Sequence, residues 1–468
     1  MSPYSITSGT LIVALDIGKN VHWFGCYHYD GRLVELVPPR KVRSDTVGFA
    51  QFTATVDPLL ASGRFPAGVF GNEHTGVYHE PWAWLIAAHY QAALQPAAAC
   101  AVAYRWLNPL LTKKRQDETS VRQRTSDRTA VAAIAACLAD GLGHPAHLLT
   151  DNAAQLRELV RSYAPVSDQL RFAGRQLLPQ VDRLWPGAIA DVKQFRRAHP
   201  DLPPPTPIVE THALDRDRLA ALLLYCPNPH DALALGAAGL IQLFHDHGYR
   251  AGPKTAEAIL TALRHSPLPP KTVAATYASR LQIDYRRYLA LAEASETLVS
   301  QITTLAPLTP ARFVDSVPGI GPLLAASYLA PLGDARYFAT ASQVWALAGY
   351  DLSTAESGDT KRIGHITKRG SPALRDTLYQ IGFHTASQCP PIGEAFLAAR
   401  ERGLGETAAV IHAAHKANRL CFTLLREARM YEPAPPAEEA HFQQRWQRFQ
   451  QQLAQQRQRH AVQQRLAA

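Results

Sequence analysis

Three acidic residues stand beside predicted strands or helices in the first third of the sequence. Asp16 ends an apolar run, Glu73 follows a later apolar run, and Asp127 lies in the first turn of a predicted helix. Mg²⁺ prefers oxygen ligands, and two-metal phosphoryl-transfer sites place carboxylates around the scissile phosphate. Each acid taken alone is equally explained as a helix cap or a surface residue, and Asp127 also suits a helix dipole.

A lone serine lies beside a run of cations in the segment STAESGDTKRIGHITKRG at 353–370. Ser357 precedes a glycine. A serine hydroxyl needs activation to act as a nucleophile, and attack on a phosphodiester develops charge that cations stabilise. The segment is either a loop that presents a nucleophile to a phosphodiester or a solvated basic turn. The cations that follow the serine are Lys361, Arg362, Lys368, Arg369 and Arg375.

The composition favours a polyanionic partner. The 468 residues are 47% hydrophobic, enough for a sizeable core, and the net charge of +9 points to nucleic acid rather than a neutral metabolite. The six cysteines form no CxxC pair, so neither a zinc knuckle nor a disulfide framework is indicated, and we expect reduced thiols in a cytoplasmic protein. We find no signal-peptide pattern and no membrane-spanning apolar run.

The first part of the chain has the pattern of a mixed α/β domain. Three short strands are predicted over 11–38, a further strand over 66–71 and a helix over 126–139, whereas 92–103 fits strand or helix. An acid on the first strand, another after a neighbouring strand and a third on a late helix is the layout of an RNase H-like (RuvC-like) nuclease. We expect this domain to span 1–150.

The middle of the chain is predicted to be a helical arm over 151–310. Two long helix-favouring segments, 153–185 and 275–305, flank a Pro-rich break at 201–207 and two shorter helical stretches. This pattern suggests an antiparallel arm, as in a coiled coil, that buries its apolar stripe against a second subunit. An ordinary helical domain is the alternative.

The last part is predicted to be a mostly helical domain over 311–432, followed by a Gln- and Arg-rich tail over 433–468. The domain opens with VPGIGP at 317–322, which suits the turn of a helix-hairpin-helix whose backbone N–H groups hold a phosphate, or a plain tight turn. The tail suits a solvated helix or a segment lying along nucleic acid.

Eight blocks, in order, resemble one family, that of the insertion-sequence-110 DEDD transposases, also called bridge-RNA-guided recombinases. The N-terminal blocks are VALDIGKNVH (13–22), NEHTGVY (72–78), NPLLTKKR (108–115) and SDRTAVAAIAACLADGLG (126–143). The C-terminal blocks are VPGIGPLLAA (317–326), GDARYFATASQVWALAGY (333–350), ESGDTKRIGHITKRGSPALRDTL (356–378) and the stretch around 397–431.

The resemblance implies four metal-binding acids, of which this chain has three. Asp16, Glu73 and Asp127 take the first three places, and the fourth place, one helical turn on, is Ala130. Shifting the register to make Asp127 the fourth acid would put Arg124 in the third place. A methyl group cannot bind a cation, so we predict that this chain binds metal weakly and cleaves poorly. The change is either natural or deliberate.

The resemblance also implies a reaction and its partners. Ser357 would attack DNA and form a phosphoserine link, assisted by Mg²⁺ on the acids, while a bridge RNA selects target and donor DNA by base pairing. We expect a dimer or tetramer, without membrane association, in the bacterial cytoplasm and associated with the nucleoid. Lys113, Lys114 and Arg115, in the basic segment 104–128, join the cations after Ser357 as candidate nucleic-acid contacts.

Two other functions fit the same residues. A metal-dependent nuclease or junction resolvase would use the acids alone and leave Ser357 as a loop residue. A nucleic-acid-binding scaffold that has lost catalysis would account for Ala130.

Overall fold

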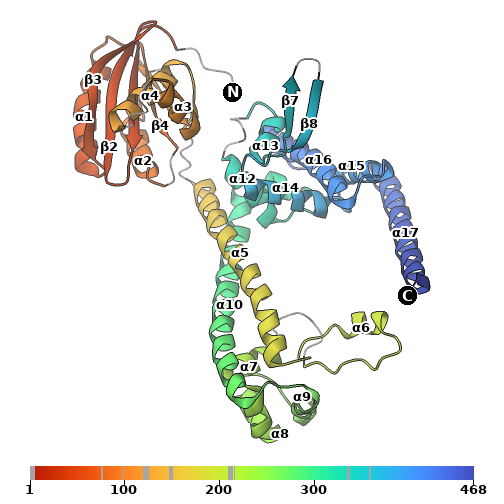
Figure 1. Ribbon diagram of the computed structural model, residues 1–468. Helices are drawn as coiled ribbons and strands as arrows, with labels where there is room; N and C mark the ends of the chain where they lie inside the picture. The colour runs from red at the N-terminus through yellow and green to blue at the C-terminus, as the bar shows by residue number, and fades with distance from the viewer. Residues whose placement is uncertain are drawn as a thin grey trace. The chain divides into compact units, whose positions relative to one another are not determined.

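The computed structural model divides the chain into two compact units, residues 1–150 and residues 151–468 (Figure 1). Each is considered by itself. The predicted division of the second unit at 310 and 432 stays a prediction. Within the described residues, no helix is both long and apolar enough to cross a membrane. The structure describes residues 6–74, 77–96, 98–119, 126–146, 151–208, 214, 217–333, 335, 338–357 and 360–467.

A six-stranded sheet organises the first unit. Its order is β3-β2-β1-β4-β5-β6, with β1 to β3 antiparallel and β4 and β5 parallel to β1. This order confirms the predicted RNase H-like fold. The ambiguous segment 92–103 resolves into a strand that begins at Ala101. The strands are β1 (Thr10–Ile17), β2 (Val21–Tyr29), β3 (Leu33–Arg43), β4 (Ala67–Glu73), β5 (Ala101–Leu107) and β6 (His144–Pro145).

Helices cover both faces of this sheet. Successive strand residues point to opposite faces, so Leu11, Val13 and Leu15 pack with α1 (Thr46–Ala61) and α2 (Glu80–His89). Ile12 and Ala14 face the other way and pack under α4 (Asp127–Ala139). Gly71 makes this packing possible, because a Cβ there would lie 2.6 Å from the Leu138 side chain. Helix α1 was not predicted from the sequence.

The predicted helix over 126–139 is confirmed, and its start is fixed locally. Ser126 and Thr129 form a capping box in which each side chain bonds the backbone N–H of the other. Asp127 is therefore held in the first turn. Helix α3 (Pro109–Thr119) packs beside α4, and Gln116 Nε2 donates to Thr129 Oγ1 at 2.8 Å.

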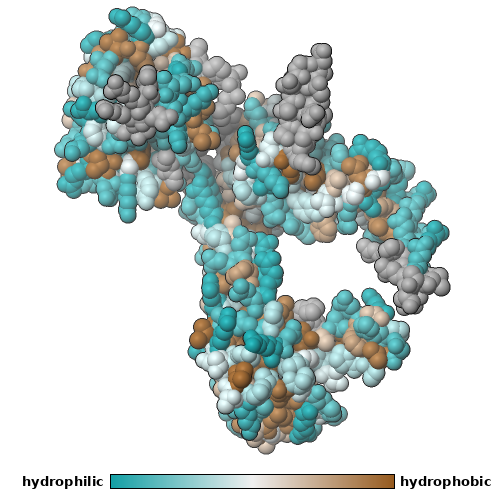
Figure 2. All heavy atoms as spheres, viewed as in Figure 1, coloured by the Kyte–Doolittle hydropathy of each residue, from teal (hydrophilic) through white to brown (hydrophobic). Residues whose placement is uncertain are grey.

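Two long antiparallel helices begin the second unit. Helix α5 (Asn152–Leu184) lies along α10 (Lys271–Leu305), and the contacts Arg183–Tyr277 and Gln180–Asp284 run in opposite directions along the two chains. Figure 2 shows mostly hydrophilic residues on the visible face of this pair. The sequence predicted two short helical stretches between them, and this number is wrong. The described residues there form α6 (Val192–Ala198), α7 (Asp217–Tyr225), α8 (Pro229–Asp246) and α9 (Pro253–His265).

The C-terminal part is a helical core with one β-hairpin. The hairpin strands are β7 (Leu352–Ser357) and β8 (Thr360–Ile366). The prediction of a loop around Ser357 is therefore wrong, because alternation in this charged segment gave no recognisable strand pattern. The short helices η1 (Ala306–Leu308), α11 (Ala311–Asp315), α12 (Pro322–Leu332) and α13 (Ala341–Leu347) precede the hairpin, and α14 (Pro372–Thr385), α15 (Pro390–Glu401) and α16 (Glu406–Glu427) follow it.

The turn at 317–322 requires glycine. Gly319 has φ +90°, and a Cβ there would lie 2.8 Å from the His384 carbonyl oxygen. The turn joins α11 to α12, which begins at Pro322, and this connectivity fits both predicted alternatives, a helix-hairpin-helix turn and a plain tight turn.

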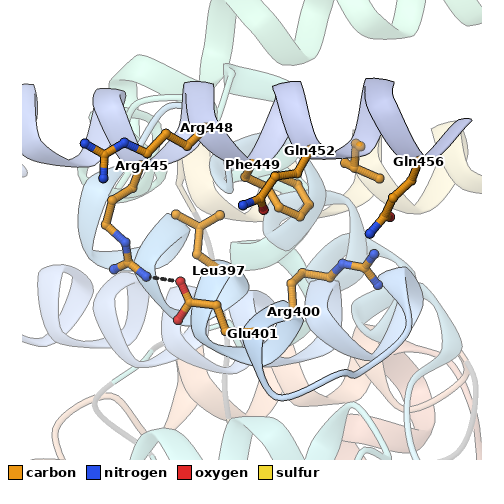
Figure 3. A pocket seen from close by; sticks show the side chains of 9 residues that line it. Leu397, Arg400, Glu401, Arg445, Arg448, Phe449, Gln452 and Gln456 are labelled. Carbon is orange, nitrogen blue, oxygen red and sulfur yellow. Dashed lines mark hydrogen bonds and ion pairs between the residues drawn. The ribbon is translucent and has the colours of Figure 1, made fainter. Parts of the chain in front are cut away.

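The tail is a helix that packs on the core. Helix α17 (Pro436–Ala467) rests on α15 through Phe442, which is 1% exposed, together with Trp446 and Phe449. Arg445 bonds both Glu394 and Glu401 of α15. A groove of about 290 Å³ lies between the two helices, lined by Arg400, Arg448 and Gln456 among others (Figure 3). Of the two alternatives for the tail, the solvated helix does not describe these turns, and the segment along nucleic acid stays a prediction.

Candidate active site

Two of the predicted acids lie side by side at one end of the sheet. Parallel pairing aligns Leu15 of β1 with Asn72 of β4, so Asp16 and Glu73 are the next residues on adjacent strands. Both have the strand parity of Ala14 and Gly71, which face α4. On the other side of Asp16, the antiparallel register places Trp23 of β2. Asp16 is therefore flanked by an aromatic ring and by a second carboxylate.

The third acid belongs to the same electrostatic site. Burial raises the pKa of Asp16 to about 6, and the negative charges of Glu73 and Asp127 add to that shift. Asp127 reaches the site from the first turn of α4, whose residues Val131 and Ile134 pack on the sheet. Three carboxylates that lie far apart in the sequence are thus close enough in the folded unit for their charges to interact.

A shell of polar contacts orients Glu73. Thr112 of α3, which is 2% exposed, donates a hydrogen bond from its hydroxyl to Glu73 Oε1. The Asn72 side chain donates to the Glu73 carbonyl oxygen at 2.7 Å and accepts from the Tyr104 hydroxyl at 2.6 Å. The sequence analysis missed Thr112, although it lies inside the block NPLLTKKR and one residue before the singled-out cations.

Ala130 lies one turn after Asp127 on the same helix. Its backbone N–H bonds the Ser126 carbonyl at 2.9 Å, and its side chain is half-buried. The methyl group offers no ligand on the face that carries Asp127. Within the described residues, no group of three or more His, Cys, Asp or Glu side chains is arranged to hold a metal ion. The acids present supply carboxylate oxygens of the kind that a hard divalent cation prefers.

The cations of α3 differ in their availability. Lys113 is exposed. Lys114 lies 4.0 Å from Glu118, and Arg115 pairs with Glu118 at 3.4 Å and with Asp140. Arg115 therefore ties α3 to the end of α4. The remainder of the predicted basic segment between 120 and 125 lies outside the described residues.

Ser357 is the last residue of β7, at the tip of the hairpin. The register pairs Ser357 with Thr360, Glu356 with Lys361 and Ala355 with Arg362. Lys361 and Arg362 are thus within the first two pairs behind the tip. The side chains of these residues, and Gly358 altogether, lie outside the described part of the chain.

The base of the hairpin is pinned to the helical core. Arg375 Nη1 donates to the carbonyl oxygens of Ala348 at 3.0 Å and Lys368 at 3.4 Å, so this predicted nucleic-acid contact is engaged with backbone. The Lys368 N–H bonds the Gly349 carbonyl at 3.0 Å, and Lys368 itself has φ +53°. Lys368 and Arg369 are exposed. The structure therefore leaves these two cations open to solvent beside β8.

Known proteins resemble parts of this chain. An uncharacterised 44.8 kDa protein of insertion element IS116 from Streptomyces clavuligerus is 31% identical over 127 residues, which is 27% of this chain and 32% of that protein. An uncharacterised 43.6 kDa protein of insertion element IS110 from Streptomyces coelicolor is 26% identical over 230 residues, 48% of this chain and 55% of that protein. The chain thus matches less than two thirds of either relative.

One solved structure and one protein family also match parts of this chain. The structure of T. thermophilus RuvC in complex with Holliday junction substrate matches 27% of this chain and 90% of its own, at 16% identity and a TM-score of 0.20, so the strand order carries the fold assignment instead. The family described as Transposase IS116/IS110/IS902 matches residues 311–398. The resemblance predicted from the sequence blocks is therefore confirmed: residues 311–398 match the transposase family model, and parts of the chain are similar to the IS110 and IS116 insertion-element proteins.

Proposed function

We propose that this protein is a DNA transposase of an insertion sequence that cuts and rejoins DNA through a phosphoserine intermediate. The observation that carries the proposal is the meeting of Asp16, Glu73 and Asp127 at one end of an RNase H-like sheet, seen in the raised pKa of Asp16. The family match over 311–398 adds a transposase domain that contains Ser357.

The proposed chemistry conserves phosphoester bonds. The Ser357 hydroxyl attacks a DNA phosphate, a Ser–O–P bond forms, and the bond from phosphorus to one bridging oxygen breaks. The departing strand end takes up a proton as a free hydroxyl. The hydroxyl end of a new partner strand then attacks the phosphoserine, restores the DNA backbone and releases the serine. Because each step exchanges one phosphoester for another, rejoining needs no external energy source.

The acids of the first unit would assist this serine. Asp16 has a pKa of about 6, so it is mostly ionised at pH 7 yet basic enough to accept a proton or hold a cation. A bound divalent ion such as Mg²⁺ would supply charge neutralisation at the scissile phosphate. Glu73 is oriented for such a role by Thr112. The two units that carry these groups would come from one subunit or from two subunits of a dimer or tetramer.

Sequence selection is proposed to come from a bridge RNA. The protein would grip target DNA, donor DNA and RNA through their phosphates, which require cations rather than base readout. Lys113, Lys368 and Arg369 are exposed and suit this role. Lys361 and Arg362 are included because their backbone lies close behind Ser357 in the hairpin.

Ala130 favours one competing function, a nucleic-acid-binding scaffold without catalysis. One carboxylate short, the acids would hold a metal ion weakly, and cleavage would be impaired. The scaffold and the impaired transposase differ in their response to repair. Ala130→Asp restores cleavage only in the transposase.

The experiment compares this chain with Ala130→Asp and with Ala130→Asp/Ser357→Ala. Each is incubated with Mg²⁺, the RNA encoded beside the gene and end-labelled DNA, and adducts are resolved on a denaturing gel. We expect a protein–DNA adduct with Ala130→Asp that is absent from the double variant. Cleavage without an adduct in the double variant would identify an acid-only nuclease. RNA binding without any reaction in all three would identify a scaffold.

A further inference from the structure

Between its two terminal acids, Glu406 and Glu427, the exposed face of α16 is rich in basic side chains. Between 408 and 426, the residues classed as exposed are His412, His415, Lys416, Arg419 and Arg426, named here the α16 basic stripe. At 100° per residue, these five positions fall within a band about 100° wide and about 21 Å long. The opposite face, including Ala413, Ala417 and Cys421, is buried in the core of the C-terminal part.

Contacts inside the protein account for only part of this stripe, because Arg426 Nη1 donates to the Phe338 carbonyl oxygen at 2.7 Å and the His415 ring contacts Trp345. Lys416 and Arg419 stand at i,i+3 spacing, where side chains are neighbours on the helix surface and like charges repel. Among the described residues, neither Lys416 nor Arg419 forms an ion pair. Burial, Arg419 and His412 together lower the pKa of His415, and no acid offsets them. The helix dipole favours cations only in the last turn, which contains Arg426 alone.

The helix that bears the stripe is firmly held. A Cβ at Gly382 of α14 would lie 2.7 Å from the Ala414 backbone nitrogen, so the two helices are in close contact. The buried Asn418 accepts from the Tyr328 hydroxyl at 2.9 Å and donates to the Ala341 carbonyl oxygen at 2.8 Å. The stripe therefore presents its charges on a rigid support, which limits the entropy lost on binding.

Aromatic contacts connect the stripe to the base of the hairpin. The His415 ring meets the Trp345 ring edge-on at 5.0 Å, and Trp345 stacks on Tyr350 at 4.2 Å. Tyr350 lies two residues before β7, and the next residue back, Gly349, accepts the Lys368 N–H. Figure 1 shows α13, α16 and the hairpin in the same part of the second unit. His415 of the stripe thus contacts α13 (Ala341–Leu347), and Lys368 bonds the backbone just after that helix.

We propose that the α16 basic stripe binds the phosphate backbone of duplex DNA and holds it beside the hairpin that carries Ser357. Its length corresponds to about six base pairs, at 3.4 Å per phosphate of one strand. Contacts to phosphates carry no sequence information, so we expect binding without sequence preference. The choice of DNA rests on the proposed function, in which DNA is the substrate of Ser357.

The test measures binding of a fluorescein-labelled random-sequence DNA duplex to the full chain by anisotropy over a series of salt concentrations. For Lys416→Gln/Arg419→Gln we expect affinity to fall about tenfold and the slope of log K against log salt to shrink by about 2. Lys416→Arg/Arg419→Lys, which keeps both charges, should bind like the parent. Lys254→Gln/Lys271→Gln removes two exposed cations elsewhere and is the matched control.

Each other outcome has a defined meaning. An unchanged affinity and salt slope in Lys416→Gln/Arg419→Gln overturns the proposal, as does an equal loss in the matched control. A loss confined to a labelled RNA of the same length overturns the assignment to DNA. Ser357→Ala is measured in the same assay and should bind DNA normally. In the Ala130→Asp background, normal DNA binding and normal adduct formation in the stripe variant would leave the proposed function standing and overturn only the stripe.

Discussion

Asp16 and Glu73 occupy the positions directly after the paired residues Leu15 and Asn72, on neighbouring parallel strands that end at the same edge. Parallel register makes this meeting a property of the backbone, so it persists when either side chain is changed. The charge of each carboxylate therefore acts on the other, and substitutions can measure it.

Asp16→Asn should stabilise the protein at neutral pH. The folded-state pKa of Asp16 is about 6, above its ordinary value of 3.8, because of burial, Glu73 and Asp127. A raised pKa means that the folded state favours the protonated acid. The contribution of Asp16 to stability is therefore greatest below about pH 4 and is lost as the pH rises through 6. Discounted for partial exposure, the gain for Asp16→Asn at pH 7.5 is about 1–2 kcal/mol.

The measurement is thermal unfolding of both proteins in EDTA at pH 4 and pH 7.5. The melting temperatures should differ at pH 7.5 and converge at pH 4. Asp117→Asn, at an exposed position of α3, removes the same charge and serves as the control. Equal melting temperatures at both pH values would show that the pKa of Asp16 is not raised in the folded protein.

Thr112→Val should weaken the candidate site while preserving the volume of the side chain. The variant removes the donor to Glu73 Oε1. We expect a stability loss of about 1 kcal/mol and, in the Ala130→Asp background, roughly 10- to 100-fold slower adduct formation. Thr112→Ser keeps the hydroxyl and should retain most activity. If Thr112→Val and Thr112→Ser form the adduct at equal rates, Thr112 does not orient Glu73.

Gly393→Ala should loosen α17. A Cβ at Gly393 would lie 2.3 Å from the Phe442 ring and 2.4 Å from the Ala386 carbonyl oxygen. Overpacking of this kind costs about 1–3 kcal/mol, so limited proteolysis between α16 and α17 should become faster. Gly405→Ala, where a Cβ meets nothing within 4 Å, is the control. Unchanged proteolysis in Gly393→Ala would mean that α17 does not depend on the Phe442 contact.

Asn418 and Tyr328 should show strong energetic coupling. Asn418→Ala leaves the buried Tyr328 hydroxyl without its side-chain acceptor, so we expect a loss of about 2–3 kcal/mol in unfolding free energy. Tyr328→Phe should cost less unfolding free energy in the Asn418→Ala protein than in the parent, because the hydroxyl that it removes is already without its side-chain acceptor. Denaturant unfolding of the four proteins measures the coupling, and additive losses would contradict the bond.

Local patterns predicted much of the first unit. Alternation and turn residues located β1, β2 and β4, and the Ser126 cap located α4. The sequence could not give the pairing of β1 with β4, because it depends on packing between segments about fifty residues apart in sequence. The joint position of Asp16 and Glu73 was therefore inferable only as an expectation from the family resemblance and the order of elements.

The second unit shows what local patterns leave out. The hairpin β7–β8 was missed because its charged residues hide the alternation of a strand. The packing of α17 had a signal that was overlooked, since Phe442, Trp446 and Phe449 recur at helical spacing within the Gln-rich tail. The sequence also did not show that the basic residues of α16 share one face, because this follows from which side of the helix is buried.

The division of the chain at residue 150 has a consequence for the safety of the host genome. The candidate acids lie in one compact unit and the hairpin of Ser357 in the other. Under the proposed mechanism, neither unit alone can break a strand, so a cut demands that both be docked on the same phosphate. Under this mechanism, DNA cleavage occurs only in copies that have assembled on the correct nucleic acids. Copies that have not assembled would leave the host DNA intact.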